Sequence, residues 1–289
     1  MSPFDYAEMT RRNIGFVTEA EQAKLRAGRV FVCGTGGMGG ACLQSLVRAG
    51  VGAFEIADGD TFETSNLNRQ VFSSVADLGQ PKVEVTARRL REIFPDVDVT
   101  LHGLDWVEHL ETILPRCPVV VNGMDDIGAA IRLYRAARRH GATVIDAYTS
   151  TLPSVVVVGP DDPRPEERLG FPTVGVDHAA WTPAMLAACR SAEIEYVLVH
   201  SSTADTLDMA IAAEIVTGKR ARISFAPMVI TTGNLLAYAV VSAVCGRPPL
   251  ADCRGWFLNP QGGRVERPRS SIVAALRRAA VRRWLGKLQ

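Results

Sequence analysis

The feature that most constrains the fold of this chain is a glycine-rich turn set between a short apolar run and a helical pattern. Residues 29–34 read Arg-Val-Phe-Val-Cys-Gly, an apolar run typical of a buried parallel strand. Residues 34–39 read Gly-Thr-Gly-Gly-Met-Gly and match the pattern G-x-G-x-x-G. A helical pattern over 41–49 and a second apolar run over 53–57 complete a strand–helix–strand unit. The chain therefore begins as one half of an open α/β sheet.

The same alternation continues through the first half of the chain. We predict further strands over 97–101, 118–122, 143–147 and 154–158, and helices over 81–94 and 129–140. Pro81 suits the first position of its helix, where a missing N–H costs nothing. Strands that alternate with helices predict a Rossmann-like α/β fold, in which a mostly parallel sheet is flanked by helices on both faces.

The second half departs from this alternation and is more elaborate. Residues 159–175 contain four prolines and many charges, which predicts a surface crossover loop. The remaining patterns predict a strand over 194–199, helices over 204–217 and 227–245, and a hairpin of strands 256–259 and 264–267. A length of 289 residues corresponds to one or two domains. We expect one domain over 1–263, with halves of about 1–150 and 151–263, and a separate basic helix over 264–289.

The basic C-terminal segment differs in charge from the rest of the chain. The whole chain has 32 Lys and Arg against 31 Asp and Glu, a balance that argues against a DNA-binding protein. Residues 264–289 nevertheless contain seven Arg, one Lys and one Glu. Leu276, Ala280, Trp284 and Leu288 recur at every fourth position, as in an amphipathic helix. We expect this helix to dock through Trp284 with its arginines in solvent; an acidic surface, a membrane or RNA are alternative partners.

One stretch is long and apolar enough to cross a bilayer. Residues 226–245 contain no charged side chain. They do contain several polar residues, among them Thr231, Thr232 and Asn234, and a buried helix of a large α/β domain has the same composition. We therefore expect a core helix and no membrane span.

The cysteines and the amino end indicate a reduced compartment. Six cysteines in a chain of this length are too few for a disulfide scaffold, and no two are spaced C-x-x-C. A structural zinc site of paired cysteines is therefore not expected. The first residues contain no apolar signal segment, so we expect a cytoplasmic protein.

Acidic and glycine residues place a nucleotide site at the end of the first two strands. The turn glycines allow a phosphate to approach the backbone at a helix N-terminus; they are Gly34, Gly36, Gly37 and Gly39. Asp58 lies 19 residues after Gly39, at the end of the second strand, where an acidic side chain accepts hydrogen bonds from ribose hydroxyls. These features alone are shared by dinucleotide oxidoreductases, which remain an alternative.

Two cations that follow distinguish this chain from a dehydrogenase. Arg69 ends the run Glu63-Thr-Ser-Asn-Leu-Asn-Arg69, and Lys82 stands in the first turn of a helix, where its charge opposes the helix dipole. Together they predict a cationic clamp for a triphosphate that expels pyrophosphate. The alternative is that both cations pair with surface carboxylates.

This stretch resembles the ThiF/MoeB family, the bacterial relatives of ubiquitin-activating enzymes. The family's signature has a GxGGxG turn, then D-x-D, then S-N-L-x-R-Q, then G-x-x-K on a helix. The chain has these elements in the same order, at Gly34–Gly39, at Asp58 and Asp60, over Ser65–Gln70 and over Gly79–Lys82. Arg12-Asn-Ile14 is similar to the family's amino-terminal R-Q-I, and Met124-Asp125-Asp126 to its T-D-N.

The resemblance implies a role for each of these residues. Asp58 and Asp60 belong to the nucleotide site, and the phosphates would be lined by Asn66, Arg69, Gln70 and Lys82. Asp125 would hold Mg²⁺, a hard cation suited to carboxylate and phosphate oxygens. Arg12 would reach the site of a second subunit, which implies a homodimer. The implied reaction is attack of a substrate carboxylate on the α-phosphorus of ATP, giving an acyl-adenylate and pyrophosphate.

The chain also departs from the family pattern. The family's zinc-binding C-x-x-C pairs are missing, Asp126 replaces an asparagine, and Ala130 stands where an arginine is usual. Cys189 is the single cysteine in the region that supplies a transfer thiol in some relatives, and its apolar context favours packing. The resemblance therefore favours activation of a peptide or small-molecule carboxylate. The alternatives are activation of a carrier-protein C-terminus with thiol transfer, and a non-catalytic partner subunit.

Overall fold

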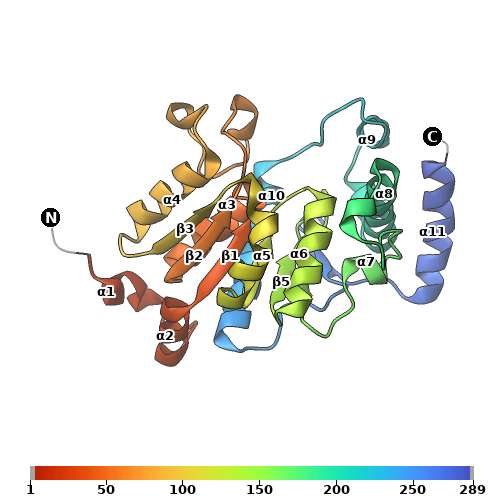
Figure 1. Cartoon of the computed structure of the whole chain (residues 1–289). Coiled ribbons are helices and arrows are strands. Elements are labelled where there is room, and N and C mark those ends of the chain that lie inside the picture. The colour runs from red at the N-terminus through yellow and green to blue at the C-terminus, as the bar shows by residue number, and fades with distance from the viewer. Residues whose placement is uncertain (1–3, 287–289) are drawn as a thin grey trace.

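The computed structural model describes residues 4–286, and within them the strands form one sheet of eight (Figure 1). The strand order is β3-β2-β1-β4-β5-β6-β7-β8. The first five in chain order are parallel: β1 (Arg29–Cys33), β2 (Ala53–Ala57), β3 (Asp98–His102), β4 (Val119–Asn122) and β5 (Thr143–Asp146). The last three add antiparallel: β6 (Ser154–Val158), β7 (Trp256–Asn259) and β8 (Arg264–Glu266). The predicted Rossmann-like sheet is confirmed.

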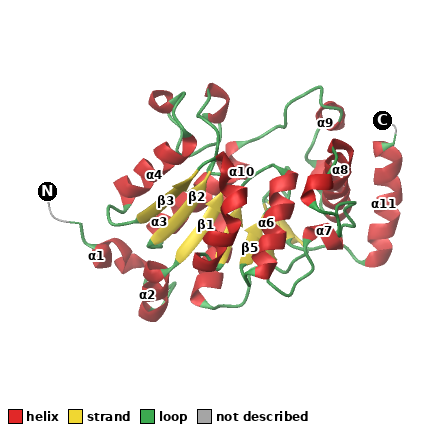
Figure 2. Cartoon of the chain, in the orientation of Figure 1, coloured by secondary structure: helices red, strands yellow, loops and turns green. Residues whose placement is uncertain are grey.

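Helices cover both faces of this sheet (Figure 2). The longer helices of the first half are α2 (Glu19–Ala27), α3 (Gly37–Arg48), α4 (Lys82–Ile93) and α6 (Ile127–Arg139). Those of the second half are α8 (Pro183–His200), α9 (Met209–Val216), α10 (Ala226–Cys245) and α11 (Ser271–Leu285). Short helices are α1 (Tyr6–Thr10), α5 (Leu110–Ile113) and α7 (Pro165–Arg168), with α1 and α11 at opposite ends of the molecule (Figure 1).

The strand order reverses between β1 and β4, and this position decides where a ligand can bind. β1 pairs with β2 on one side and with β4 on the other, both parallel. The connections from β1 and β4 therefore leave toward opposite faces of the sheet. In open α/β sheets such a switch point leaves a crevice outside the carboxyl ends of the strands. The glycine turn follows β1 at this edge, which is the upper edge in Figure 1.

The long apolar helix α10 packs along α3 on one face of the sheet. A Cβ at Gly233 would lie 2.5 Å from Ala41 Cβ and 2.6 Å from the Met38 carbonyl oxygen, so the two helices are in backbone contact. Val229, Leu236 and others on this side of α10 are buried. By length and composition α10 is the one helix of the described residues that could cross a membrane. One side of it packs against α3, while Asn234 and Tyr238 on another side are exposed.

Two segments of the second half differ from their predicted structure. The strand expected over 194–199 is wrong, because those residues form the end of α8. Pro183 stands in the first turn of α8 and Thr182 caps it by accepting from Met185 N, signals that outweigh a short apolar run. The helix expected over 204–217 is shorter, since Asp208 caps a new start by accepting from Ala210 N at 2.8 Å.

The basic C-terminal helix docks on α8; Trp284, through which docking was expected, is half-buried and lines a cavity with α8 residues. α11 begins at Ser271, after β8 has joined the sheet. Its arginines, expected in solvent, make much of the contact: Arg282 Nε donates to Glu195 at 2.8 Å and Arg277 to the Leu198 carbonyl at 3.0 Å. Leu276, expected in the buried stripe, is 72% exposed. Lys287 and Leu288 lie outside the described residues.

Candidate active site

In the glycine turn after β1, a side chain at Gly34 or Gly39 would clash with neighbouring backbone atoms. Gly34 has a φ of +85°, and a Cβ there would lie 2.7 Å from the Gly123 carbonyl. A Cβ at Gly39 would lie 1.8 Å from the Gly34 carbonyl oxygen. Gly36 begins α3 without a capping side chain. The first N–H groups of a helix have no partner inside the helix, so this end of α3 suits an anion.

Asp58 is fixed beside the glycine turn. Its Oδ2 accepts from Thr35 N at 2.8 Å and from Thr35 Oγ1 at 3.1 Å, and its Oδ1 accepts from Asp60 N at 3.0 Å. Oδ1 accepts one hydrogen bond and keeps a second lone pair, so Asp58 can still accept a hydroxyl hydrogen. The end of β2 is thereby tied to the turn after β1.

Lys82 is the first residue of α4 and is almost fully buried. Its side chain is 7% exposed, and its Nζ donates to Asp60 Oδ2 at 2.8 Å. Pro81 stands just before the helix, at its N-cap, one position earlier than expected. The carboxylate of Asp60 is 72% exposed, so Lys82 is held by a group that solvent still reaches. Lys82 is therefore paired with a carboxylate, as the alternative interpretation of the two cations had it.

The Ser65–Gln70 segment brings further polar groups to the same turn. Arg69 donates to the Ser65 carbonyl at 2.8 Å and to Asn68 Oδ1 at 2.9 Å, and its Cγ lies 3.8 Å from where a Cβ on Gly37 would stand. A Cβ on Gly36 would lie 3.4 Å from Gln70 Nε2. Gln70 Oε1 is buried and, within residues 4–286, has no hydrogen-bond partner. An orphaned buried acceptor at a phosphate-type turn indicates that a donor from solvent or a ligand belongs there.

Asn66 has a structural role within this segment. Its Oδ1 accepts from Glu63 N at 3.0 Å, and the side chain is buried. This bond closes the short turn that presents Arg69 and Gln70. The structure therefore gathers the glycines, Asp58, Asp60, Asn66, Arg69, Gln70 and Lys82 at one edge of the sheet.

Asp125 follows β4 at the same edge, but it is already paired. Its carboxylate makes an ion pair with Arg222, whose other guanidinium nitrogen donates to Thr149 Oγ1 at 3.4 Å. Asp126 caps α6 by accepting from Ala129 N at 3.0 Å. In the part of the chain that the structure describes, no three His, Cys, Asp or Glu side chains gather as a metal cluster. Sequence reasoning missed Arg222, because the resemblance is faint in its region.

Arg12 lies at the opposite edge of the sheet. It is exposed on a short 3-10 helix, Arg11–Asn13, and the neighbouring Asn13 donates to the Ala49 carbonyl at 3.2 Å, just beyond the C-terminal end of α3. The glycine turn is at the other end of α3, about 18 Å away for a helix of 12 residues. The structure does not bring Arg12 together with the other predicted site residues of its own chain.

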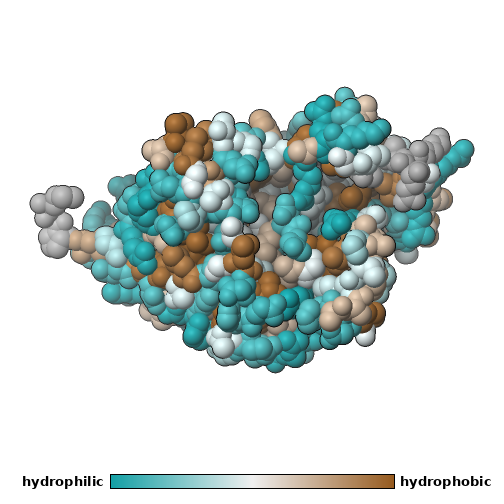
Figure 3. Space-filling view, turned by 45° about the horizontal axis from the view of Figure 1, so that its top comes forward, coloured by the Kyte–Doolittle hydropathy of each residue, from teal (hydrophilic) through white to brown (hydrophobic). Residues whose placement is uncertain are grey.

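A cavity of about 740 Å³ opens beside Asp125. It lies between the ends of β4 and β5, α6, α7 and α8, and the segment that carries Arg222. Figure 3 shows the surface hollowed at this edge, between the part of the molecule with α4 and the part with α9. A smaller apolar cavity of about 140 Å³ adjoins it and shares Thr149, Ile194, Ile215 and Arg222.

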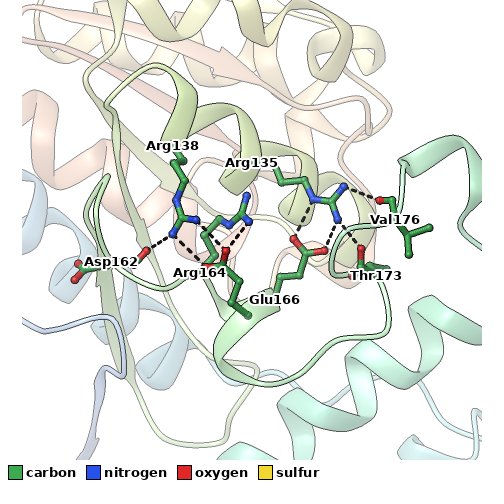
Figure 4. A network of polar contacts seen from close by, with 8 residues as sticks. Arg135, Arg138, Asp162, Arg164, Glu166, Thr173 and Val176 are labelled. Carbon is green, nitrogen blue, oxygen red and sulfur yellow. Dashed lines mark hydrogen bonds and ion pairs between the residues drawn. The ribbon is translucent and has the colours of Figure 1, made fainter.

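The crossover loop, residues 159–176, forms one wall of the cavity and is hydrogen-bonded to α6 (Figure 4). Arg135 pairs with the buried Glu166 and donates to the Thr173 and Val176 carbonyls at 2.7 and 2.8 Å. Arg138 donates to the Asp162 carbonyl at 2.6 Å. These bonds hold the loop in place, so the wall is preformed.

The remaining candidate groups in this region are a thiol and a His–Asp pair. Cys189 is fully buried among apolar side chains, and burial raises the pKa of its thiol, which disfavours a nucleophilic thiolate. His178 Nδ1 lies 3.5 Å from Asp177 Oδ1 on the surface. Neither feature lies among the residues that line the large cavity.

Two acidic side chains in the cavity have raised pKa values. Asp146 accepts from Tyr134 OH at 2.7 Å, Asn122 Nδ2 at 2.9 Å and Ala147 N at 2.6 Å, yet burial raises its pKa. Burial, followed by the nearby Asp146 charge, raises the pKa of Glu193 to about 7. Acids with raised pKa values in a cavity are candidates for a functional site.

Comparison with known proteins finds similar chains along most of this sequence. The model of the ThiF family matches residues 10–272. The sulfur carrier protein ThiS adenylyltransferase of Bacillus subtilis is 37% identical over 123 residues, which are 42% of this chain and 37% of that protein. The molybdopterin-synthase adenylyltransferase of Haemophilus influenzae is 37% identical over 107 residues, which are 37% of this chain and 44% of that protein. The chain thus spans less than half the length of these curated relatives.

Among solved structures, the crystal structure of E. coli MccB with ATP resembles the chain along most of its length. The TM-score is 0.63 with 19% identity, and the match covers 93% of this chain and 75% of that one. At this identity the likeness shows a shared fold.

Proposed function

The chain belongs to the ThiF family, and from that premise we propose that it uses ATP to adenylate a substrate carboxylate. The observation that carries the proposal is the joint position of the glycine turn, Asp58 and Lys82 at the switch point of the sheet. A turn with free helix N–H groups suits a phosphate, and a fixed acid suits a ribose. The relatives named above are adenylyltransferases, which supports the same reaction.

The nucleotide would lie along the carboxyl edge of the sheet. Asp58 would accept from the ribose, and the N-terminus of α3 would face a phosphate. The orphaned Oε1 of Gln70 marks a position where a donor is missing, beside Gly36. Arg69 and Lys82 would stabilise the charge that grows on the β- and γ-phosphates as pyrophosphate leaves.

The reaction itself needs positioning and charge stabilisation. A substrate carboxylate is an anion at neutral pH, so no base is needed for its attack on the α-phosphorus. One carboxylate oxygen forms a bond to phosphorus, and the bond from phosphorus to the β-phosphate oxygen breaks with its electron pair. The products are an acyl-adenylate and pyrophosphate. The large cavity beside Asp125 is where the rest of the substrate would lie.

Mg²⁺ fits this site under one condition. Magnesium in phosphate sites is commonly bound by one or two carboxylates together with substrate phosphates, so Asp125 alone is a sufficient protein ligand. Its carboxylate is 77% exposed, but Arg222 must first leave it. The ion would neutralise phosphate charge in the departing pyrophosphate.

Arg12 supports a dimeric active species. Its guanidinium cannot span the length of α3 to reach its own site, so the family-like role would be served in a second subunit. We therefore propose a homodimer with two composite sites. The six free cysteines fit a reducing, cytoplasmic environment.

The buried Cys189 favours peptide or small-molecule activation over thiol transfer from a carrier protein. A non-catalytic subunit is disfavoured by the buried Lys82, because a buried lysine is costly to retain without a role.

ATP–pyrophosphate exchange tests this proposal. The panel would contain amino acids, short peptides, simple organic acids and carrier proteins that end in Gly-Gly. Exchange that depends on one carboxylate class supports adenylation and names the class. NADH binding in place of ATP binding would support the oxidoreductase alternative.

A further inference from the structure

We propose that the large cavity binds a carboxylic acid that also carries a protonated amine, and that Glu193 is the carboxylate that receives the amine. This inference rests on the proposed function and names the class of its substrate. The substrate carboxylate would lie near the Asp125 end of the cavity, where the nucleotide phosphates end, and its amine at the α8 wall.

The first step is the pairing of the acids that line the cavity. Asp125 is paired with Arg222, Asp126 caps α6, and Glu166 is paired with Arg135. Asp146 accepts three hydrogen bonds. Across residues 4–286, Glu193 alone of these acids has neither a hydrogen bond nor an ion pair. The cavity therefore presents one carboxylate whose acceptor capacity is unused.

The second step is that the position of Glu193 on α8 directs its side chain toward the cavity. Glu193 and Glu195 are two residues apart, so they lie on nearly opposite sides of the helix. Glu195 faces α11, where it pairs with Arg278 at 3.0 Å and Arg282 at 2.8 Å. Glu193 is directed into the cavity instead, next to Ile194. Arg190, on the same wall, lies beyond ion-pair distance of Glu193, since no such pair occurs in the described chain.

The third step is the cost of leaving Glu193 unpaired. Burial and the Asp146 charge raise its pKa to about 7, while Arg168, Arg222 and Arg190 lower it. The phenol of Tyr134, which donates to Asp146, lines the same cavity. Glu193 is half-buried, so its carboxylate is partly desolvated yet reachable from the cavity, and a perturbed acid in a cavity is a candidate for a binding site. An ammonium at Glu193 would supply the missing partner and restore the ionised form of the acid.

The fourth step is the character of the cavity walls. They are mixed: apolar side chains such as Ile127, Ile131, Phe171, Leu186 and Ile194 lie among polar and charged ones. Such a lining suits the carbon skeleton of a small organic molecule with polar ends. At the Glu193 end, away from the phosphates, a metal ion fits less well. The oxygens of Asp146 already accept three hydrogen bonds, which leaves Glu193 as the one remaining carboxylate ligand there.

The test compares amines with matched acids that lack the amine. The probes are aminohexanoate, phenylalanine and leucylphenylalanine, each against the des-amino acid of the same skeleton. Binding is measured by saturation-transfer NMR and titration on the full chain, with and without a non-hydrolysable ATP analogue. We expect each amine to bind about tenfold or more tightly than its partner, the value of one charge-assisted contact in a partly buried site.

Variants of α8 identify the residue responsible. Glu193→Gln keeps the shape of the side chain and should abolish the preference for amines. Glu195→Gln, which changes the same residue type on the other side of the same helix, should keep it. The proposal is overturned by equal or tighter binding of the des-amino acids, by a preference that survives in Glu193→Gln, or by absence of binding for every amine in both nucleotide states.

The two proposals fail in different ways. Binding is read without turnover, so amines that bind through Glu193 but support no pyrophosphate exchange would contradict the proposed function alone. Exchange that occurs with acids lacking an amine, and is unchanged in Glu193→Gln, would contradict this inference alone.

Discussion

The guanidinium of Arg222 is ion-paired with the carboxylate of Asp125, at the mouth of the large cavity. Asp125 is the residue to which the family resemblance assigns magnesium, so a cation of the chain itself lies where the metal would bind. Arg222 comes from the segment just before α10, far from Asp125 in sequence. The pair is partly exposed, and such pairs are worth less than about 1 kcal/mol, so an ATP-bound metal can displace Arg222.

Removing Arg222 should make magnesium easier to bind. In Arg222→Ala the Asp125 carboxylate has no competing cation, so the Mg²⁺ concentration for half-maximal exchange should fall about two- to fivefold. Arg220→Ala is the matched control, because Arg220 pairs with Glu214 in the same segment. An unchanged magnesium requirement in Arg222→Ala would contradict competition at Asp125. Asp125→Ala should abolish magnesium-dependent turnover and leave the fold intact.

The two cations at the glycine turn should each matter for turnover. Arg69→Ala and Lys82→Ala are expected to lower the rate of pyrophosphate exchange about 100-fold or more, the scale for loss of one preorganised donor. Lys24→Ala is the control, since Lys24 binds the Cys245 carbonyl at the other edge of the sheet. Circular dichroism would establish that each variant is folded. A variant that is folded and exchanges at the wild-type rate would remove that residue from the site.

A methyl group in the glycine turn should prevent nucleotide binding. In Gly39→Ala the new Cβ would overlap the Gly34 carbonyl oxygen, so the turn must open and α3 must shift from β1. We expect a lower melting temperature and no ATP binding by calorimetry. Gly103→Ala is the control, because a Cβ there meets nothing closer than 3.4 Å. Normal ATP affinity in Gly39→Ala would mean that the nucleotide lies elsewhere.

Stability should depend on pH through Glu193. The pKa of this acid is about 7 in the folded chain against 4.5 for the ordinary side chain, so the folded chain keeps a proton that the unfolded chain has released. Stability therefore falls as pH rises from 4.5 to about 7, by about 3 kcal/mol in total. Glu193→Gln removes this loss, so its free energy of unfolding should exceed that of the wild type at about pH 8. At about pH 5.5 the difference between the two proteins should be about 2 kcal/mol less favourable to the variant.

Urea unfolding at the two pH values measures this difference. Glu195→Gln is the control: it keeps Glu193 and should therefore keep the pH dependence of the wild type. The same pH dependence in wild type and Glu193→Gln would mean that Glu193 is ionised at little cost in the folded chain.

Mixed dimers test whether Arg12 serves a second subunit. Arg12→Ala and Lys82→Ala should each be nearly inactive alone. A mixture should recover activity, because one composite site of the mixed dimer has both residues intact. Native mass spectrometry would first establish that subunits exchange. Exchange of subunits without any recovery would mean that Arg12 completes no neighbouring site.

The regular part of the fold was predictable because local and global signals agree there. The apolar runs at β1 and β2, the glycines between them and Pro81 before α4 each favour the structure that formed. The strand predicted over 194–199 was wrong, because a short apolar segment suits a buried strand or a helix equally. The start of α8, eleven residues earlier, decides for the helix.

The site was predictable where its residues are close in sequence and less so where they meet only in space. Asp58, Arg69 and Lys82 belong to one stretch, and the structure gathers them. The pair Arg222–Asp125 depends on tertiary packing between segments 97 residues apart and has no sequence period. The contact of α11 with α8 was missed for a related reason, since long arginine side chains can bind backbone carbonyls as well as solvent.

The most direct test of carboxylate adenylation follows heavy oxygen from the substrate into AMP. A carboxylic acid that supports pyrophosphate exchange is labelled in both carboxyl oxygens and incubated with ATP and protein until the acyl-adenylate has turned over. Attack of the carboxylate on the α-phosphorus predicts AMP that carries one labelled oxygen, detected by mass spectrometry, together with pyrophosphate. Unlabelled AMP, or ADP and phosphate as the products, would contradict the account.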